Sequence, residues 1–221
     1  MGITCWVCDV RPLADPALFS KGVSLLPWED RREQIMRFRL ERDRRLCLGA
    51  GLLLAHALRY AGATDLSLRR LANGKPVLAA CPDIHFNLSH SGTLAVCAVS
   101  DQPVGADVEV LQSGDSHVAA LCFQPPELEW MNRFDDSAYP FTRLWTRKES
   151  YLKLLGTGLS RSPNSFRVIP GKDTPSGCTF SEREKDGHLI CICSFQNDEV
   201  IFREWQLPTE SHEAKIWIDS I

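Results

Sequence analysis

The sequence predicts an α+β protein of two similar lobes, each built from helices and antiparallel strands and related by a pseudo-twofold axis. Two observations support this fold. Helical patterns precede a series of short strands in both halves of the chain, and the turn at Gln102-Pro103 separates the halves. We therefore expect an N-terminal lobe over residues 1–102 and a C-terminal lobe over residues 103–221, with a functional site in the cleft between them.

The N-terminal lobe is expected to open with a strand over residues 3–10, followed by a helical stretch from Glu29 to Tyr60. A short strand and a turn follow in LSLRRLANGKPVL, where Asn-Gly is a strong turn dipeptide. Two more strands are predicted in IHFNLSHSG and TLAVCAVSD, because a Ser-Gly turn separates two apolar stretches.

The C-terminal lobe is expected to begin with a strand in VGADVEV, and its most motif-rich part lies between residues 104 and 165. Helices are predicted in HVAALCF, PPELEWMNRF and FTRLWTRKESYLKLLG, the last one ended by Gly156 and Gly158. We expect the stretches SFRVIP, GHLICICSF, IFREWQL and AKIWI to form antiparallel strands joined by polar turns.

The composition is that of a folded protein and excludes several classes. Apolar residues make up 44% of the chain, yet no apolar run approaches the ~20 residues that span a bilayer. The N-terminus lacks the features of a signal peptide. The nine cysteines are odd in number and several lie in apolar patterns, which favours free thiols in a reducing cytoplasm. The net charge of −3 argues against a general nucleic-acid binder, so we expect neither nucleic acid nor membrane as a partner.

Three familiar types of catalytic or metal site are missing from the sequence. No G-x-S-x-G nucleophile elbow and no Walker loop is present, which excludes α/β-hydrolase and P-loop chemistry. The CWVC motif has no second half with the right spacing for zinc.

A basic segment, RREQIMRFRLERDRR, runs from Arg31 to Arg45 and holds seven arginines against three acidic residues. Arginine forks suit phosphate or carboxylate groups. A solvated helix face with both signs of charge explains the segment equally well.

The strand VGADVEV carries the sharpest pattern. Alternation places Gly105, Asp107 and Glu109 on one face, with the two carboxylates roughly 6–7 Å apart at the backbone. A divalent cation relieves the repulsion between such carboxylates, and oxygen ligands suit magnesium. The alternative is an amphipathic strand with a polar outer face.

A second polar strand, HFNLSHSG, ends in a Ser-Gly turn whose backbone amides are able to face an anion. Ser89 and His90 lie close in sequence to the NGKP turn that carries Lys75, so together they indicate a phosphate cradle. The alternative is that His90 is a structural group at a strand end.

The helix in LWTRKESYLKLLGTG places Lys148 on its apolar face, at about 100° per residue, with Glu149 and Lys153 at the edge of that face. A buried ammonium is costly unless a negative group meets it. Either Glu149 and Lys153 form an ordinary surface pair beside a snorkelling Lys148, or a polyanion enters a cleft at this face and contacts both lysines.

Taken together, GADVE, LWTRKESYLKLLGTGL, NGKP and FNLSHSG resemble the 4′-phosphopantetheinyl transferase superfamily. More specifically, the sequence is similar to the larger, pseudo-dimeric type of this superfamily, which activates nonribosomal peptide and polyketide synthetases. The resemblance implies Mg²⁺-dependent transfer of the phosphopantetheine arm of coenzyme A to a serine of an acyl or peptidyl carrier protein, which releases adenosine 3′,5′-bisphosphate. Members of this type usually act as monomers, and we expect the same here.

The resemblance also implies roles for particular residues. Asp107, Glu109 and Glu149 match the carboxylates that hold magnesium, and Glu149 also matches the base for the carrier serine. Lys153 matches the lysine that steadies the leaving pyrophosphate oxygen, and Glu127 is a further metal-ligand candidate. Matches to the coenzyme A pocket are Gly74, Lys75, Pro76, Ser89, His90 and Lys148.

One departure from the family pattern concerns the 3′-phosphate of coenzyme A. Two lysines often contact it from the basic helix region, where this sequence has Arg31 and Gln34. We therefore expect Arg31 and Arg45 to make this contact.

Two other functions compete with this interpretation. One is a coenzyme A-binding or carrier-binding module without transfer activity. The three acidic residues Asp107, Glu109 and Glu149 and the nearby Lys153 argue against this function, because a pure binding module needs no catalytic base. The other is a different magnesium-dependent phosphotransferase that uses another nucleotide. The sequence names no natural carrier protein and no docking surface for one.

Overall fold

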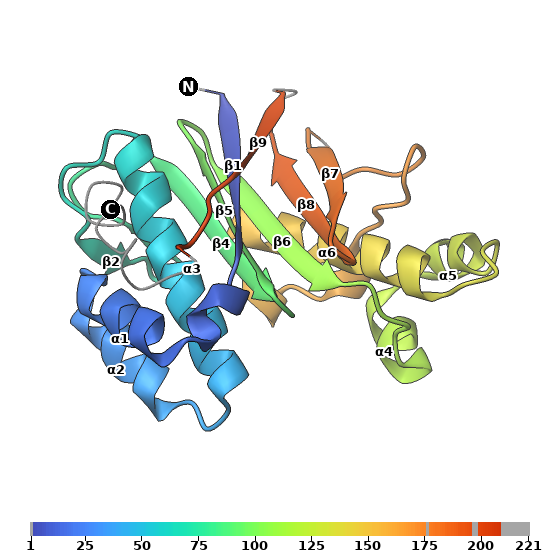
Figure 1. The fold of residues 1–221 in the computed structure, drawn as a ribbon. Coiled ribbons are helices and arrows are strands. Elements are labelled where there is room, and N and C mark those ends of the chain that lie inside the picture. Colours follow the sequence, from blue (N-terminus) through green and yellow to red (C-terminus); the bar gives the residue numbers. More distant parts are fainter. Residues whose placement is uncertain (1, 176, 196–198, 209–221) are drawn as a thin grey trace.

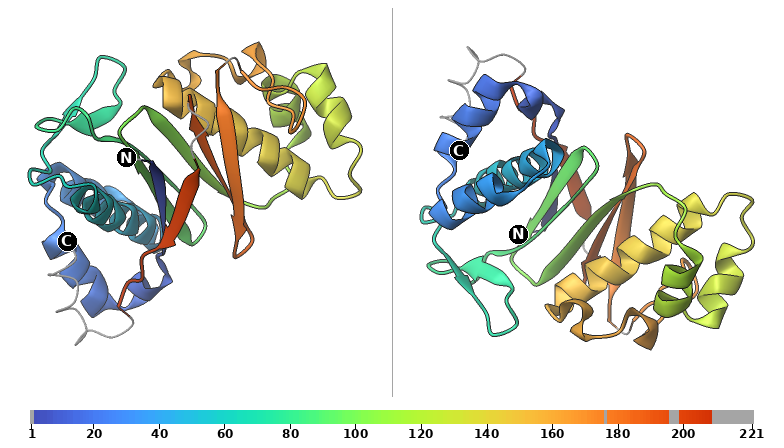
Figure 2. Two further views of the ribbon diagram at one scale, coloured as in Figure 1. Left: turned by 90° about the horizontal axis from the view of Figure 1, so that it is seen from above. Right: turned by 90° about the horizontal axis from the view of Figure 1, so that it is seen from below.

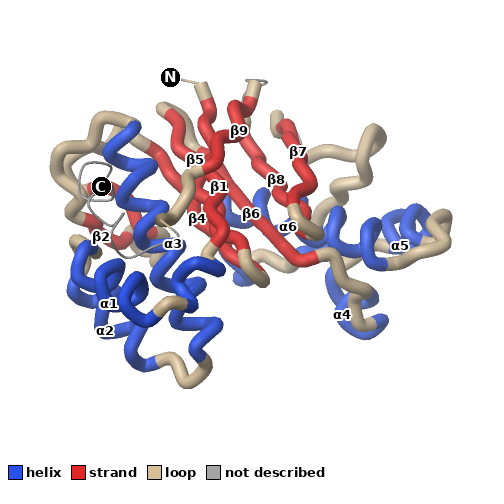
Figure 3. The backbone as a smooth tube through the Cα atoms, viewed as in Figure 1, coloured by secondary structure: helices blue, strands red, loops and turns tan. Residues whose placement is uncertain are grey.

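The computed structural model describes residues 2–175, 177–195 and 199–208, and it shows the predicted α+β fold (Figure 1). Two mainly antiparallel sheets lie at the centre and helices cover their outer faces (Figure 3). The order of layers is helix, sheet, sheet and helix, as the views in Figure 2 show.

The first lobe contains a four-stranded sheet in the order β4-β5-β1-β9. The bounds of its strands are Ile3–Asp9 for β1, His85–Ser91 for β4, Leu94–Ser100 for β5 and Val200–Glu204 for β9. Its helices are α1 (Pro16–Leu25), α2 (Glu29–Arg37) and α3 (Glu41–Tyr60), with a short 3-10 helix at Arg11–Ala14. A separate hairpin, β2 (Leu68–Arg70) and β3 (Pro76–Leu78), turns at Gly74, whose φ is +83°.

The second lobe contains a three-stranded antiparallel sheet in the order β6-β8-β7. Its strands are β6 (Val104–Val110), β7 (Thr179–Lys185) and β8 (His188–Ser194), and its helices are α4 (Ser116–Cys122), α5 (Pro125–Met131) and α6 (Ala138–Leu155). Two 3-10 helices follow α6, at Gly158–Ser160 and Pro163–Ser165.

The two sheets pack face to face through an apolar core between the lobes. Ile3, Cys5 and Val7 of β1 contribute to this core from one side, and Val104, Ala106 and Val108 of β6 contribute from the other. The opposite face of β1, with Trp6 and Cys8, packs with α3 in the core of the first lobe. Strand β1 is therefore apolar on both faces because each face has a covering layer.

Gly105 sets the distance between β6 and α6. A Cβ atom at this position would lie 1.9 Å from the backbone oxygen of Ser150 and 2.6 Å from the nitrogen of Leu154. Because Gly105 has no side chain, the backbone of α6 can pack directly against β6. The helix therefore lies over the face of the strand that carries the carboxylates.

Several sequence predictions need correction. The stretch SFRVIP is not a strand, whereas α1 and β7 were not predicted. The predicted helical stretch from Glu29 to Tyr60 is broken between Arg37 and Glu41. Strand β9 pairs in parallel with β1, so this part of the chain returns to the sheet of the first lobe. The predicted strand AKIWI lies outside the described residues.

Two further expectations concern thiols and membranes. The nine cysteines are free thiols. No helix in the described part of the chain is both long and apolar enough to span a bilayer.

Lys148 is buried inside the second lobe, where a carboxylate rather than a substrate meets its ammonium. Its Nζ lies 2.9 Å from Oε2 of Glu127, and both side chains are 0% exposed. The same ammonium donates to the backbone oxygens of Pro163 and Phe166, at 2.9 and 2.6 Å. Glu127 Oε1 in turn accepts from the backbone N–H of Val168 at 2.9 Å.

This placement corrects two predictions from the sequence. Lys148 does lie on the buried face of α6, as the periodicity indicates, but it does not contact a phosphate from there. Glu127 balances that ammonium and is not a metal ligand. The pair instead ties the segment after α6 to α5 and α6.

We predict that Lys148→Met destabilises the protein by about 3–5 kcal/mol, because it leaves the Glu127 carboxylate buried without a counter-charge. The double variant Lys148→Met/Glu127→Gln should be more stable than Lys148→Met, since the amide carries no charge and keeps one of the two oxygens that accept the backbone N–H groups of Gln124 and Val168. Urea denaturation at neutral pH measures both values. If the double variant is no more stable than the single one, the ion-pair explanation is wrong.

A second ion-pair cluster joins α6 to β7 and predicts a pH dependence. Burial alone would raise the pKa of Glu182, but hydrogen bonds and charge from Arg147 and Arg143 hold this pKa below its ordinary value. The resulting stability is fully present above the unfolded-state pKa, and it is lost as the pH falls through the lower folded-state pKa.

Glu182→Gln should therefore cost about 2 kcal/mol of unfolding free energy at neutral pH. The difference from the wild type should shrink as the pH falls from about 4.5 toward the lower folded-state pKa. Urea denaturation of both proteins across this range tests the assignment, and a difference that is constant with pH would contradict it.

Candidate functional site

The two lobes meet along the neighbouring strands β4 and β6. Hydrogen bonds from side chains, rather than a backbone ladder, join these two strands. Ser89 Oγ donates to Asp107 Oδ1 at 2.8 Å, and Ser91 Oγ donates to Glu109 Oε2 at 2.7 Å. Asn87 Oδ1 accepts the backbone N–H of Ala106 at 2.9 Å. Alternation in each strand brings these groups to one face, so the polar residues predicted in HFNLSHSG lie against those predicted in VGADVEV.

Helix α6 contributes a third set of side chains to the same place. Trp145, Glu149 and Lys153 follow one another at intervals of four residues and therefore share a helix face. Lys153 Nζ lies 2.5 Å from Asp107 Oδ1 and donates to Ser89 Oγ at 2.9 Å. Lys148 lies on another face of α6, which explains why two neighbouring residues, Lys148 and Glu149, have different surroundings.

These side chains surround a cavity between the lobes, which we call the carboxylate cavity. Of the residues predicted from the sequence, the structure brings seven together here. The lining residues are Arg31, Leu88, Ser89, His90, Asp107, Glu109, Trp145, Glu149 and Lys153.

The acidic side chains of the carboxylate cavity disfavour each other's charge. Burial, followed by the charge of Asp107, raises the pKa of Glu149 above its usual value, and Glu109 adds to this shift. Burial likewise raises the pKa values of Glu109 and Asp107, although Lys153 opposes both shifts. Partial desolvation and the positive charges of Arg31 and Lys153 lower the pKa of His90. The cavity therefore favours ligands that bring both a cation and an anion.

A divalent cation fits the donors of this cavity. Asp107 Oδ2 is buried and has no hydrogen-bond partner, so one carboxylate oxygen is free to ligate. Glu109 and Glu149 supply further oxygen donors, which suit magnesium. Among the described residues no three potential ligands are already gathered into a metal site, and the ammonium of Lys153 balances Asp107 instead.

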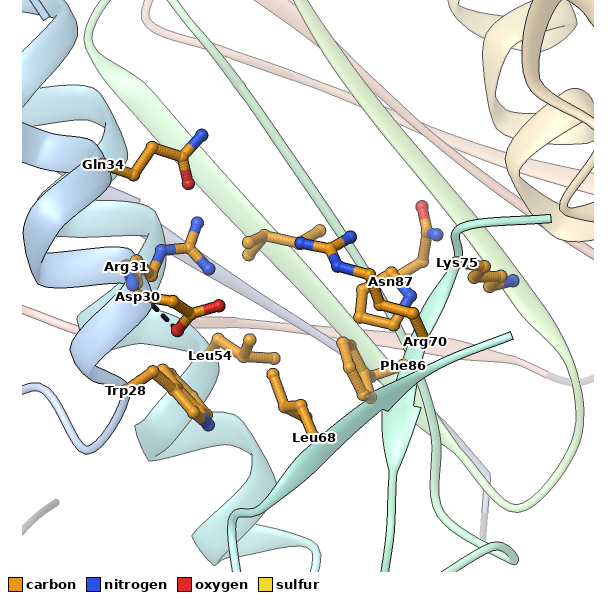
Figure 4. Close-up of a pocket in the computed structure, with 12 residues that line it drawn as sticks. Trp28, Asp30, Arg31, Gln34, Leu54, Leu68, Arg70, Lys75, Phe86 and Asn87 are labelled. Carbon is orange, nitrogen blue, oxygen red and sulfur yellow. Dashed lines mark hydrogen bonds between the residues drawn. The ribbon is translucent and has the colours of Figure 1, made fainter. Parts of the chain in front are cut away.

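A second cavity adjoins the first, and we call it the arginine cavity (Figure 4). Arg31 and Leu88 line both cavities, so the two are neighbours that meet at these residues. The other lining residues of the arginine cavity are Trp28, Asp30, Gln34, Leu54, Leu68, Arg70, Lys75, Pro76, Phe86 and Asn87. Trp28, Leu54, Leu68 and Phe86 give it an apolar floor.

Two cations point into the arginine cavity, from α2 and from the β2–β3 hairpin. Arg31 and Arg70 extend toward one another in Figure 4. The Nε of Arg31 is buried without a hydrogen-bond partner. The sequence reasoning missed Arg70, Trp28 and Phe86. Their positions depend on how the hairpin and α2 pack, and no local motif marks them.

The remaining predicted residues have mixed placements. Pro76 and Lys75 line the arginine cavity, and Gly74 forms the adjoining turn. The Lys75 ammonium, however, donates to the backbone oxygen of Lys153 at 2.8 Å. Arg45 lines a separate cavity with Leu13 and Phe19 and lines neither of the two cavities that Arg31 lines.

Comparison with known proteins identifies the family to which the chain is related. The model of the 4′-phosphopantetheinyl transferase superfamily matches residues 103–208, and the model of the 4′-phosphopantetheinyl transferase N-terminal region matches residues 14–102.

Individual relatives give the same result. A 4′-phosphopantetheinyl transferase of Bacillus subtilis is 36% identical over 176 residues, which cover 77% of each chain. 4′-Phosphopantetheinyl transferase Sfp of Bacillus subtilis strain 168 is 30% identical over 184 residues, which cover 76% of this chain and 82% of its own. 4′-Phosphopantetheinyl transferase HetI of a Nostoc species is 35% identical over 131 residues, or 55% of each chain. The resemblance read from the sequence is thus confirmed, and the chain belongs to the 4′-phosphopantetheinyl transferase superfamily.

Proposed function

We propose that this protein transfers the 4′-phosphopantetheine arm of coenzyme A to a serine of an apo acyl or peptidyl carrier protein. The observation that carries the proposal is the pair of neighbouring cavities that share Arg31 and Leu88 as lining residues. One cavity offers carboxylates and Lys153, and the other offers two guanidinium groups above an apolar floor. Family membership supports the same reaction.

Coenzyme A has the right parts for both cavities. Its adenine and phosphorylated ribose match the apolar floor and the arginines of the arginine cavity, with Pro76 and the stem of Lys75 as one wall. Its pyrophosphate matches the carboxylate cavity, where Ser89, His90, Arg31 and Lys153 supply donors and positive charge. Arg31 lies at the junction and is placed to contact either part.

Asp107, Glu109 and Glu149 would hold Mg²⁺ on the pyrophosphate. When bound, the ion polarises a phosphoryl oxygen and neutralises charge that develops during transfer. The unpartnered Oδ2 of Asp107 and the like-charge arrangement of the carboxylates support this assignment.

The protein side chains have separate roles in the transfer. Glu149, whose raised pKa brings it closer to neutral pH, accepts the proton of the carrier serine. The serine oxygen forms a bond to the β-phosphorus, and the bond from that phosphorus to the bridging oxygen breaks. Lys153 steadies this bridging oxygen, which leaves as part of adenosine 3′,5′-bisphosphate. Positioning and charge stabilisation supply most of the rate gain in such reactions.

We further propose that the protein acts as a monomer in the cytoplasm. The face-to-face packing of its two lobes places both walls of the site in one chain. Nine free thiols are in keeping with a reducing compartment.

Intact-mass analysis of an apo carrier protein tests the proposed function. Incubation with this protein, coenzyme A and Mg²⁺ should add the mass of one phosphopantetheine, and a chelator should prevent the gain. Tight binding of coenzyme A without modification of any of several unrelated carriers would favour a binding module instead. A preference for ATP over coenzyme A in thermal-shift measurements would favour another phosphotransferase.

Asp107→Asn and Glu149→Gln should each lower kcat/KM for the carrier by about a hundredfold or more. Neither variant should unfold, because burial disfavours the charge that each one removes. Glu129→Gln, an exposed change on α5, is the matched control and should leave kcat/KM unchanged. Steady-state kinetics and urea denaturation give the two readouts. Near-normal kcat/KM in either site variant would contradict the site assignment.

A further inference from the structure

Lys75 links two parts of the molecule that come from different lobes. It follows the Gly74 turn of the β2–β3 hairpin in the first lobe. Its Nζ donates to the backbone oxygens of Lys153 and Leu154 in the second lobe, at 2.8 and 3.5 Å. Figure 4 shows this side chain extending away from Arg31 and Arg70, although its stem lines the arginine cavity.

The two carbonyl groups belong to the last turn of α6. Helix C-termini leave backbone oxygens without helical partners and carry partial negative charge, so a cation is favourable there. Gly156 caps the helix in the left-handed conformation, with φ of +69°, and its N–H donates to the oxygen of Lys153 at 3.2 Å. Lys75 thus completes the cap from outside the helix.

The hairpin tip also packs closely against this cap. A Cβ atom on Gly156 would lie 2.6 Å from Asn73 Nδ2 and 3.4 Å from Lys75 Cδ. Asn73 Oδ1 accepts the backbone N–H of Lys75 at 3.1 Å, which fixes the shape of the turn. The hairpin and the end of α6 therefore fit together without room for a side chain at residue 156.

The residue whose backbone Lys75 holds is itself part of the proposed site. Lys153 extends its ammonium to Asp107 and Ser89. Displacement of the Lys153 backbone would move that ammonium, and small misplacements of catalytic groups lower rates steeply.

We propose that Lys75 is a positioning residue: through the α6 carbonyls it holds Lys153 in place and connects the wall of the arginine cavity to the catalytic helix. This inference rests on the proposed function for its kinetic part. It differs from the role that the family resemblance implies, because the ammonium of Lys75 is committed to backbone oxygens and does not bind a phosphate of coenzyme A.

Hydrogen exchange tests the structural part without any assay of activity. In Lys75→Met, which keeps the length of the stem, the amides of Gly156 and Thr157 should exchange at least about threefold faster than in the wild type. The matched control is Arg69→Gln, an exposed change on the same hairpin that should leave these amides unchanged. Unchanged exchange in Lys75→Met would overturn the inference.

Kinetics test the functional part. Lys75→Met should lower kcat about tenfold to a hundredfold, while the Kd for coenzyme A, measured by calorimetry, changes less than about threefold. In a Lys153→Met background the same change should have almost no further effect on kcat, because both act through one group. Lys75→Arg, which keeps donors and charge, should retain most of the wild-type kcat and guards against a Lys75→Met variant that fails to fold.

The opposite results identify the other roles. A large rise in the Kd for coenzyme A with kcat preserved would mean that the Lys75 ammonium binds a phosphate, and the inference would be wrong. Full additivity with Lys153→Met would also overturn it. A wild-type protein that modifies no carrier would contradict the proposed function, while the exchange experiment would still decide whether Lys75 fastens α6.

Discussion

The seam between β4 and β6 is the feature on which the site depends. Here the edges of two sheets meet through serine hydroxyls that donate to Asp107 and Glu109, rather than through a continuous backbone ladder. An apolar core behind the seam holds the two sheets face to face. Two carboxylates are thereby fixed between lobes, partly desolvated, with Lys153 as their nearest counter-charge. Holding two partly desolvated carboxylates close together costs free energy when no ligand is bound. A bound cation that brings a polyanionic ligand would reduce the repulsion between them.

The faces of helix α6 have different roles: one face contributes to the stability of the second lobe, and another carries side chains of the proposed active site. One face carries Lys148 into the lobe, where Glu127 and backbone oxygens satisfy it, and this network orders the segment that follows the helix. Another face carries Glu149 and Lys153 to the cavity. Gly105 lets the helix lie directly on β6, so the side chains of α6 and Asp107 meet at hydrogen-bond distance. The Lys75 contact at the end of α6 also connects the β2–β3 hairpin of the first lobe to this helix.

Local patterns predicted most of the fold and most of the carboxylate cavity. Alternation in VGADVEV correctly placed Gly105, Asp107 and Glu109 on one face, and helical spacing correctly placed Lys148 on the buried face of α6. The partner of Lys148 was not predictable, because periodicity gives a direction around the helix but not the element that covers it. Arg70 and the parallel β1–β9 pair were missed for the same reason, since both depend on packing between distant segments.

A crystal structure of the protein with coenzyme A and Mg²⁺ would show whether the two cavities together form the coenzyme A site. Adenine should lie on the apolar floor beside Trp28 and Phe86 in the arginine cavity. The pyrophosphate should lie in the carboxylate cavity, with the metal on Asp107, Glu109 and Glu149 and with Lys153 beside the bridging oxygen. Coenzyme A bound outside the two cavities, or a pyrophosphate distant from these carboxylates, would contradict the proposed site.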